Sequence, residues 1–150
     1  MNVEKLLETA AAMVAPGKGI LAIDESTGTI KKRLDSVNVE NSETNRRDYR
    51  DMLLTTPDLG EHISGAILFE ETLRQKGKNG TAFVEIMKDA GVIPGIKVDK
   101  GAHPMAGFEG ELITEGLDGL RDRLNEYAEL GARFAKWRAV ITISDGTPSQ

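Results

Sequence analysis

The segment GILAIDESTG, residues 19–28, is an apolar run that ends in two acids, a hydroxyl and a glycine. We expect its apolar part, up to Ile23, to form a buried strand, because a strand covered on both faces is continuously hydrophobic. Asp24 then lies at the carboxyl end of this strand, where parallel α/β sheets mount ligand-binding and catalytic side chains. A second interpretation stays open, in which Asp24 and Ser26 only cap the next helix.

The same pattern recurs further along the chain. Residues 65–69 form a short apolar run followed by two acids, residues 92–99 end in Asp99, and residues 134–141 predict a fourth strand. Helical spacing fills the intervals, so strand and helix alternate four times. This alternation is typical of an α/β fold with a parallel sheet and right-handed crossovers. Four units fit either a small open sheet or half of a (β/α)8 barrel, which typically needs about 250 residues.

The expected helices have recognisable ends. They lie at residues 3–14, at 30–34, between Ser42 and Pro57, from Thr81 to Gly91, and from Leu117 to Gly131. Ser42 and Thr81 are the expected N-caps, and Gly91 the expected C′ residue. The Ser42 helix should bury Tyr49, Met52 and Leu53. Residues 101–116 contain glycine and proline, and the length of this loop predicts a functional lid.

Composition excludes several classes of protein. At 150 residues, the chain is long enough for a single domain with a substantial core. A formal net charge of −5 argues against nucleic acid as a partner, because such binding requires a basic surface. No cysteine is present, which fits a reducing compartment. The apolar run Ala10–Ala15 is too short for a membrane span or a signal, so we expect a cytoplasmic protein without a membrane partner.

Cations interrupt two of the predicted strands. Lys97 lies between Ile96 and Val98, while Lys136 and Arg138 share one face of their strand because side chains repeat every two residues. In a dry core each charge would need a partner. A polar cavity lined by Asp24 and these cations would suit a ligand with phosphates. The alternative is that the lysines lie on exposed edges or in internal ion pairs.

Other motifs give no support for a cofactor. Gly17-Lys18-Gly19 lacks the spacing of a phosphate-binding loop, and it precedes a strand instead of following one. His62 and His103 are isolated from each other and from any repeated carboxylate spacing. We therefore expect neither a nucleotide cofactor nor a metal.

Six blocks of sequence, in order, cover nearly the whole chain and resemble class I fructose-bisphosphate aldolase. They are LAIDESTG (21–28), NRR (45–47), ILFEETL (67–73), GIKVDKG (95–101), GLDGL (116–120) and FAKWR (134–138). The resemblance implies a (β/α)8 TIM barrel, of which residues 1–150 would supply the N-terminal part, about four β/α units of a single domain. It also implies a metal-free lyase of glycolysis and gluconeogenesis, usually a cytoplasmic homotetramer. That enzyme cleaves fructose 1,6-bisphosphate to glycerone phosphate and glyceraldehyde 3-phosphate through a lysine Schiff base.

The resemblance assigns roles to individual residues. Asp24 matches the aspartate that contacts the substrate hydroxyls and assists proton movement at the imine stage. Lys136 matches the lysine that helps to form and dehydrate the carbinolamine. The substrate-binding positions are Lys97 and Arg138 in the pocket, and Ser26, Thr29, Arg33 and Arg46 at or around substrate phosphate. Thr29 stands where serine is frequent in the family, and Ile23 where alanine is common.

The Schiff-base lysine of the family comes from a later strand, so we expect residues 1–150 alone to lack turnover. Two other functions remain open at this point. One is a non-catalytic half-barrel that acts as an interaction or regulatory module. The other is a different phosphosugar enzyme on a short α/β sheet.

Overall fold

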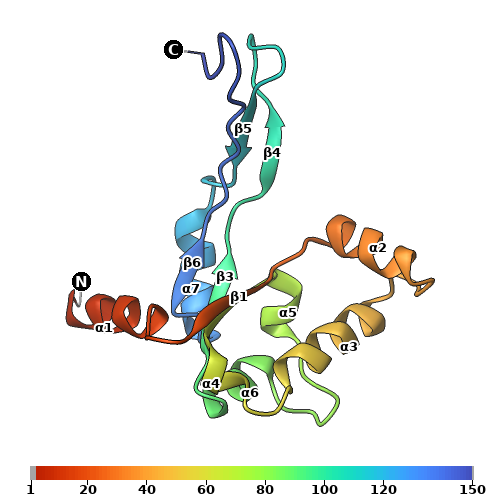
Figure 1. Ribbon diagram of the computed structural model, residues 1–150, viewed down its shortest axis with the longest axis vertical. Coiled ribbons are helices and arrows are strands. Elements are labelled where there is room, and N and C mark those ends of the chain that lie inside the picture. The colour runs from red at the N-terminus through yellow and green to blue at the C-terminus, as the bar shows by residue number, and fades with distance from the viewer. Residues whose placement is uncertain (1–2, 150) are drawn as a thin grey trace.

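A computed structural model describes residues 3–149 (Figure 1). The helices are α1 (Val3–Met13), α2 (Thr27–Ser36), α3 (Glu43–Leu54), α4 (Leu59–His62), α5 (Glu70–Arg74), α6 (Phe83–Asp89) and α7 (Leu120–Glu129). The strands are β1 (Gly19–Ile23), β2 (Ile63–Leu68), β3 (Ile93–Lys97), β4 (Gly101–Pro104), β5 (Leu112–Glu115) and β6 (Phe134–Lys136). None of these helices is long and apolar enough to cross a membrane.

The main sheet has four strands in the order β1-β2-β3-β6, and every neighbouring pair is parallel. This confirms the predicted alternation of strand and helix. On a flat sheet the two edge strands would lie about 14 Å apart, three times the usual strand spacing. Yet Lys136 of β6 contacts Asp24, directly after β1, at 2.6 Å. The sheet therefore curls so that its edges approach each other, as the wall of a barrel does.

The two faces of this curled sheet differ in composition. The register places Gly95 beside Phe134 and Lys97 beside Lys136, so alternate residues of β3 and β6 share the concave face. A Cβ at Gly95 would lie 2.2 Å from the Phe134 ring, which shows that the ring lies directly against the glycine backbone. The glycine thus lets an aromatic ring cover the middle of the concave face, and the lysines occupy its carboxyl end.

The convex face carries the hydrophobic core. Ile23, Leu68 and Ile96 project from β1, β2 and β3 into a buried cluster with residues of α3, α5, α6 and α7. Phe83 and Met87 of α6 are completely buried in this cluster. Gly91 has φ +71° directly after Ala90, the C-cap of α6, which confirms the predicted C′ glycine. The helix layer and the sheet together hold the strand ends in place.

The strand boundaries differ from those expected. The β1 strand is not covered on both faces, since Ile23 is its buried residue and Ile20 is 43% exposed on an edge strand. The β6 strand ends at Lys136, because its pairing with β3 ends at Lys97. The expected continuation to residue 141 is therefore wrong, and Arg138 lies beyond the strand.

The helix α3 buries the predicted face only in part, since Leu53 packs against the core as expected but the fully buried residues are others. Ser42 is its N-cap and accepts a hydrogen bond from Asn45 N, as expected. The buried residues are Arg50, Asp51 and Leu54, whereas Met52 is 60% exposed. Apolar spacing misplaced the face because the guanidinium of Arg50 finds backbone and carboxylate acceptors at the end of β1.

Two further helices begin later than the sequence predicted. The N-cap of α6 is Ala82, not Thr81. The helix α7 begins at Leu120, and its buried residue is Tyr127, whereas Leu117 is 71% exposed. The hydrophobic spacing of the sequence did not predict the short helices α4 and α5.

The loop expected at residues 101–116 forms an antiparallel hairpin instead. The strands β4 and β5 pair from Gly101 with Glu115 to Pro104 with Leu112. The hairpin projects away from the sheet, and the C-terminal residues run beside it (Figure 1). Hydrogen bonds join the two segments: Thr142 Oγ1 donates to Gly110 O at 3.4 Å, and Ser149 N donates to both carboxylate oxygens of Glu111, at 3.3 Å from Oε1 and 3.0 Å from Oε2.

Candidate active site at the carboxyl ends of the strands

A cavity of about 520 Å³ opens where β1, β3 and β6 end. It brings together seven of the residues proposed from sequence: Asp24, Ser26, Thr29, Arg33, Lys97, Lys136 and Arg138. Glu25, Phe69, Asp99, Lys100 and Val140 also line it. The predicted convergence of Asp24 with the strand cations is therefore found. Lys97 and Lys136 also lie in ion pairs, so the second part of the alternative expectation, internal ion pairs, is found in the same cavity.

The pair formed by Asp24 and Lys136 spans this cavity. Lys136 Nζ donates to Asp24 Oδ2 at 2.6 Å, and the lysine and aspartate side chains are 29% and 13% exposed. Their elements form opposite edges of the sheet, so the contact depends on the curl described above. A short ammonium–carboxylate contact in a partly shielded cavity is a suitable device for moving a proton to and from a bound ligand.

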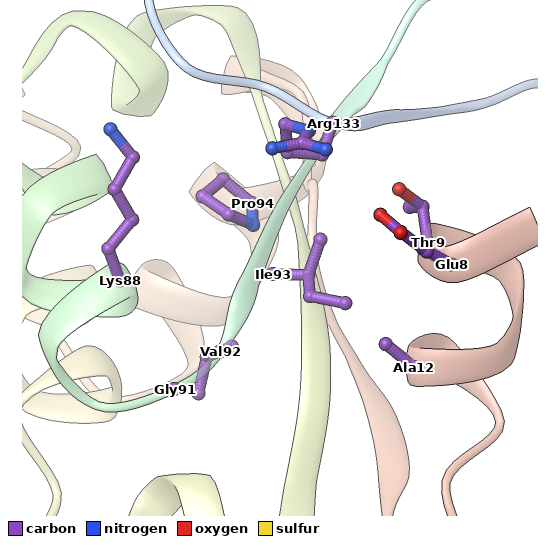
Figure 2. A pocket seen from close by; sticks show the side chains of 9 residues that line it. All are labelled: Glu8, Thr9, Ala12, Lys88, Gly91, Val92, Ile93, Pro94 and Arg133. Carbon is purple, nitrogen blue, oxygen red and sulfur yellow. The ribbon is translucent and has the colours of Figure 1, made fainter. Parts of the chain in front are cut away.

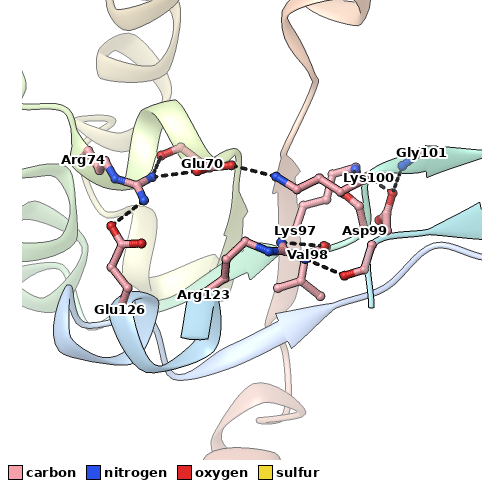
Figure 3. Close-up of polar contacts among 10 residues, drawn as sticks. Glu70, Arg74, Lys97, Val98, Asp99, Lys100, Gly101, Arg123 and Glu126 are labelled. Atoms are coloured by element: carbon pink, nitrogen blue, oxygen red, sulfur yellow. Dashed lines mark hydrogen bonds and ion pairs between the residues drawn. The ribbon is translucent and has the colours of Figure 1, made fainter. Parts of the chain in front are cut away.

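Asp99 organises the second lysine and the strand ends around it. Lys97 Nζ donates to Asp99 Oδ1 at 2.6 Å, and Gly101 N donates to the same oxygen at 3.2 Å (Figure 3). Arg138 N donates to Asp99 Oδ2 at 3.1 Å. Burial opposes ionisation of Asp99, but the Lys97 ammonium and the two backbone donors outweigh it and lower the pKa of this carboxyl. Asp99 is therefore a fixed anion that holds Lys97 and the chain beyond β6.

A second ionic network braces the wall beside Lys97. Lys100 contacts Glu70 at 3.2 Å, Glu70 contacts Arg74 at 3.3 Å, and Arg74 contacts Glu126 at 2.6 Å (Figure 3). Arg123 of α7 donates to Val98 O at 3.0 Å and to Gly116 O. These contacts tie α5 and α7 to the end of β3 and to the base of the hairpin.

Arg33 lies at the rim of the cavity on α2. Its Nη1 contacts Glu25 Oε1 at 2.5 Å and donates to the Tyr49 hydroxyl at 3.2 Å. The hydrogen bond with Tyr49, followed by the charge of Glu25, raises the pKa of Arg33. The Arg33 side chain is 58% exposed. Its guanidinium is held by Glu25 and Tyr49 but still faces solvent, where it can bind an anion.

Two hydroxyls lie next to this rim. Ser26 is the N-cap residue of α2, but its side chain accepts no capping hydrogen bond. Its Oγ instead lies 3.1 Å from Thr29 Oγ1, and both residues line the cavity. Ser26 therefore occupies the N-cap position of α2 as the second interpretation expected, but its side chain does not cap the helix.

Arg46 is the predicted site residue that does not line the cavity. It forms a fork on Glu71, with Nε at 2.8 Å from Oε2 and Nη2 at 2.6 Å from Oε1. It also donates to Asn41 O at 3.1 Å. Hydrogen bonding to Glu71 is the main cause that raises the pKa of Arg46, and the same contact lowers the pKa of Glu71. Arg46 therefore joins α3 to α5 through Glu71 and does not line the cavity.

Sequence reasoning missed the acids that hold the cations. Glu25 and Asp99 are buried and line the cavity, and neither was predicted as a site residue. Asp99 follows a predicted strand in the same way as Asp24, and that signal was available. Glu25 gave none, because its carboxylate turns toward Arg33 and Arg50 only in the folded chain.

Within residues 3–149, no group of three or more His, Cys, Asp or Glu side chains is arranged to hold a metal ion. The chemistry that the cavity offers is that of paired ammonium and carboxylate groups with guanidinium groups beside them. Such a set binds anionic oxygens and transfers protons.

The opposite end of the sheet has a different kind of cleft. A cavity of about 410 Å³ lies between α1 and β3, where Ala12 faces Ile93 (Figure 2). Val92 and Pro94 add apolar surface, and Lys88 and Arg133 lie at its margin. The Lys88 ammonium is paired with Glu85 at 2.8 Å on the surface of α6. No opposed pair like that of Asp24 and Lys136 is found among the residues that line this cleft.

A curled parallel sheet with charged side chains gathered at its carboxyl end is typical of the (β/α)8-barrel class of proteins. Comparisons with known proteins narrow the class. The family model described as "Fructose-bisphosphate aldolase class-I" matches residues 5–150. The chain therefore belongs to the class I fructose-bisphosphate aldolase family, which confirms the resemblance found in the sequence.

Individual relatives and a solved structure agree with this membership. The chain is 68% identical over 99% of its length to the "Probable fructose-bisphosphate aldolase class 1" of Xanthomonas campestris, of which it spans 45%. It is 60% identical over 98% of its length to "Fructose-bisphosphate aldolase 6, cytosolic" of Arabidopsis thaliana, of which it spans 41%. The fructose-bisphosphate aldolase of Plasmodium falciparum, solved with TRAP and a small-molecule inhibitor, superposes with a TM-score of 0.93. That match has 52% identity and covers 97% of this chain and 42% of the other.

The chain thus spans less than half the length of these relatives. Its four parallel strands correspond to the first β/α units of the aldolase barrel.

Proposed function

We propose that residues 1–150 are the N-terminal part of a single barrel domain that cleaves fructose 1,6-bisphosphate. The products are glycerone phosphate and glyceraldehyde 3-phosphate, and the reaction runs through a lysine Schiff base. The observation that carries the proposal is the 2.6 Å contact between Lys136 and Asp24, which lies in one cavity with Lys97, Arg33 and Arg138. Membership of the aldolase family supports the substrate and the reaction.

In this proposal Lys136 and Asp24 handle protons rather than form the imine. A lysine amine elsewhere in the full polypeptide adds to the substrate carbonyl and gives a carbinolamine, which loses water to become the Schiff base. Lys136 supplies a proton to the departing hydroxyl and is reprotonated from solvent or substrate. Asp24 holds the Lys136 ammonium and contacts the substrate hydroxyls. As the carbon–carbon bond breaks, one hydroxyl gives its proton to a carboxylate base of the full polypeptide, and the electron pair of the bond moves into the imine to form an enamine. Protonation of the enamine and addition of water then release glycerone phosphate and return the lysine amine.

The phosphates of the substrate are held by the cations of the rim. Arg33 presents an exposed guanidinium, and the Ser26 and Thr29 hydroxyls lie beside it as neutral donors. Lys97 and Arg138 face the same cavity and balance the negative charge of the ligand. Arg46 supports this wall through Glu71 without touching the ligand.

We also propose that the reaction uses no metal and no organic cofactor, because the Schiff base itself stabilises the carbanion. A cytoplasmic location is supported by a relative that carries "cytosolic" in its name. A homotetramer is proposed from the resemblance of the sequence to the family alone. The anionic substrate accords with a site rich in cations despite the net charge of −5.

Trapping with borohydride tests the proposed function. The full polypeptide that carries this chain is incubated with fructose 1,6-bisphosphate and sodium borohydride, and the reduced adduct is located by peptide mass mapping. We expect one adduct, on a lysine outside residues 1–150, and turnover that survives a chelator. Residues 1–150 expressed alone should give neither adduct nor turnover. An adduct on Lys97 or Lys136 would contradict the assignment, and no adduct in the full polypeptide would favour a non-catalytic interaction module.

A further inference from the structure

The helix α3 sends one completely buried cation to the end of β1. Arg50 is 0% exposed, and its Nη2 donates to Glu25 O at 2.9 Å and contacts Glu25 Oε2 at 3.3 Å. Its Nε donates to Ile23 O at 3.4 Å. Ile23 and Glu25 are the residues on either side of Asp24. One guanidinium therefore holds both peptide carbonyls that flank the aspartate.

The same guanidinium reaches the rim of the cavity through Glu25. The carboxylate of Glu25 is shared, since Oε2 faces Arg50 and Oε1 faces Arg33 at 2.5 Å. Tyr49, the neighbour of Arg50 on α3, accepts a hydrogen bond from Arg33. Arg50 thus contacts the backbone on both sides of Asp24, and it reaches Arg33 through the Glu25 carboxylate. It does not line the cavity itself.

Stability alone does not call for a charged residue at this position. Burial lowers the pKa of Arg50, while the charge of Glu25 opposes that effect. Nη1 is buried without a hydrogen-bond partner among the described residues. A well-packed apolar side chain is frequently as stable as a buried ion pair. What an apolar residue or a lysine cannot supply is a rigid fork that binds two carbonyls and a carboxylate together.

We propose that Arg50 is a positioning residue of the carboxyl-end cavity: it orients Asp24 toward Lys136 and holds Arg33, through Glu25, where a phosphate binds. The inference rests on the proposed aldol cleavage for its kinetic consequences. Arg50 is not assigned a catalytic role, because it does not line the cavity.

The test compares Arg50→Lys, Arg50→Ala and Glu25→Gln in the full polypeptide, with Arg47→Lys as the matched control on the same helix. Arg47 is paired with Asp48 at 2.6 Å, away from the end of β1. We expect Arg50→Lys to lower kcat about 100-fold, as misplaced catalytic groups do. Its KM should rise about tenfold, the loss of about one charge-assisted contact to phosphate. Arg47→Lys should keep both constants within about twofold of the wild type.

The other two variants separate positioning from folding. Glu25→Gln releases Arg33 but leaves Arg50 on the two carbonyls, so KM should rise while kcat stays within about threefold of the wild type. In Arg50→Ala, low concentrations of guanidinium chloride should restore part of kcat by occupying the vacated space. A merely structural role predicts lower resistance to unfolding, with kcat per folded molecule unchanged and no rescue.

A binding measurement separates this inference from the proposed function. Isothermal titration calorimetry of the full polypeptide measures the affinity of the cavity for inorganic phosphate. Titration with inorganic phosphate should show weaker binding in Arg50→Lys and Glu25→Gln than in Arg47→Lys, whether or not the wild type cleaves the sugar. A wild type that binds phosphate without cleavage would contradict the proposed function only. Wild-type kinetics and wild-type phosphate affinity in Arg50→Lys would overturn the role of Arg50, as would a wild type that shows neither binding nor cleavage.

Discussion

The two ends of the sheet have cavities of similar size and opposite chemistry. The carboxyl end encloses about 520 Å³ among paired charges, and the amino end about 410 Å³ among apolar residues such as Val92 and Ile93. Size therefore does not mark the functional end. What marks it is that Lys97 and Lys136 meet carboxylates at 2.6 Å in partly buried pairs, whereas the Lys88 pair at the amino end lies on the exposed surface.

This difference has a physical origin in the direction of the strands. All four strands of the main sheet point the same way, so the segments that follow β1, β3 and β6 meet at one end of the sheet, the carboxyl end. Those segments can carry charged groups without entering the core. At the amino end, β3 follows α6, whose Phe83 and Met87 are buried, and Val92 just before β3 belongs to the same core cluster. We therefore expect residues at this end to contribute to stability. The following substitutions test that division, beginning with the largest expected effect.

Lys136→Met should lower kcat for aldol cleavage by the full polypeptide about 1,000-fold, because it removes the proton donor that contacts Asp24. The loss corresponds to about 4 kcal/mol of transition-state stabilisation. Steady-state kinetics measure it, and borohydride trapping should show the imine forming more slowly. A kcat within tenfold of the wild type would mean that the charged end of the sheet is not where the proton transfer occurs.

Val92→Ala at the amino end should leave kcat unchanged and destabilise the fold by about 2 kcal/mol. Val92 is 1% exposed and belongs to the core cluster, so the truncation leaves a small cavity. Denaturant unfolding of the full polypeptide gives the stability, and the rate assay is the control. A large loss of kcat with unchanged stability would reverse the roles assigned to the two ends.

Asp99→Asn should cost about 1.5 kcal/mol of stability at neutral pH, because Lys97 and two backbone donors lose a charged acceptor. Burial opposes the ionisation of Asp99, but the Lys97 contact and the two backbone donors lower its folded-state pKa overall. Its carboxylate therefore stabilises the fold above the ordinary carboxyl pKa, and this contribution is lost as pH falls through the lowered value. Unfolding curves across the acidic range should show the wild type approaching the variant. A difference that stays constant with pH would exclude ionised Asp99 as its source.

Lys88→Met is the counterpart of Lys136→Met at the amino end and should have the smallest effect. Its ion pair with Glu85 has side chains 47% and 56% exposed, and such surface pairs contribute about 0.5 kcal/mol or less. Both kcat and the unfolding midpoint should match the wild type. A clear loss of turnover would show that the amino-end cleft takes part in function.

Much of the fold could be predicted because its signals are local. The apolar runs before Asp24, Glu70 and Asp99 indicated three parallel strands, and the glycine at 91 marked the end of α6. Two of the errors have a common cause. The face of α3 and the end of β6 depend on partners far away in the chain: the carbonyls at the end of β1 and the last pair with β3. The hairpin at 101–115 is a local pairing of β4 with β5 that was interpreted as a loop.

The candidate site divides in the same way. Its cations were visible in the sequence because charges within apolar strands are unusual and require an explanation. Asp24, which holds Lys136, was visible as the acid at the end of a predicted strand. Glu25 was not, since it looks like any acid in a turn until Arg50 and Arg33 meet it. Arg46 was assigned by resemblance, yet it forms a fork on Glu71 and is not among the residues that line the cavity.

By itself, then, the sequence determined the parallel α/β class, the family and the cationic character of the site, because strand periodicity and residue type are written locally. Only the tertiary structure decided which charges meet. Lys136 and Asp24 are 112 positions apart and on opposite edges of the sheet, and they touch because the sheet curls. Curvature arises from the twist and packing of all the strands together, and no single segment encodes it.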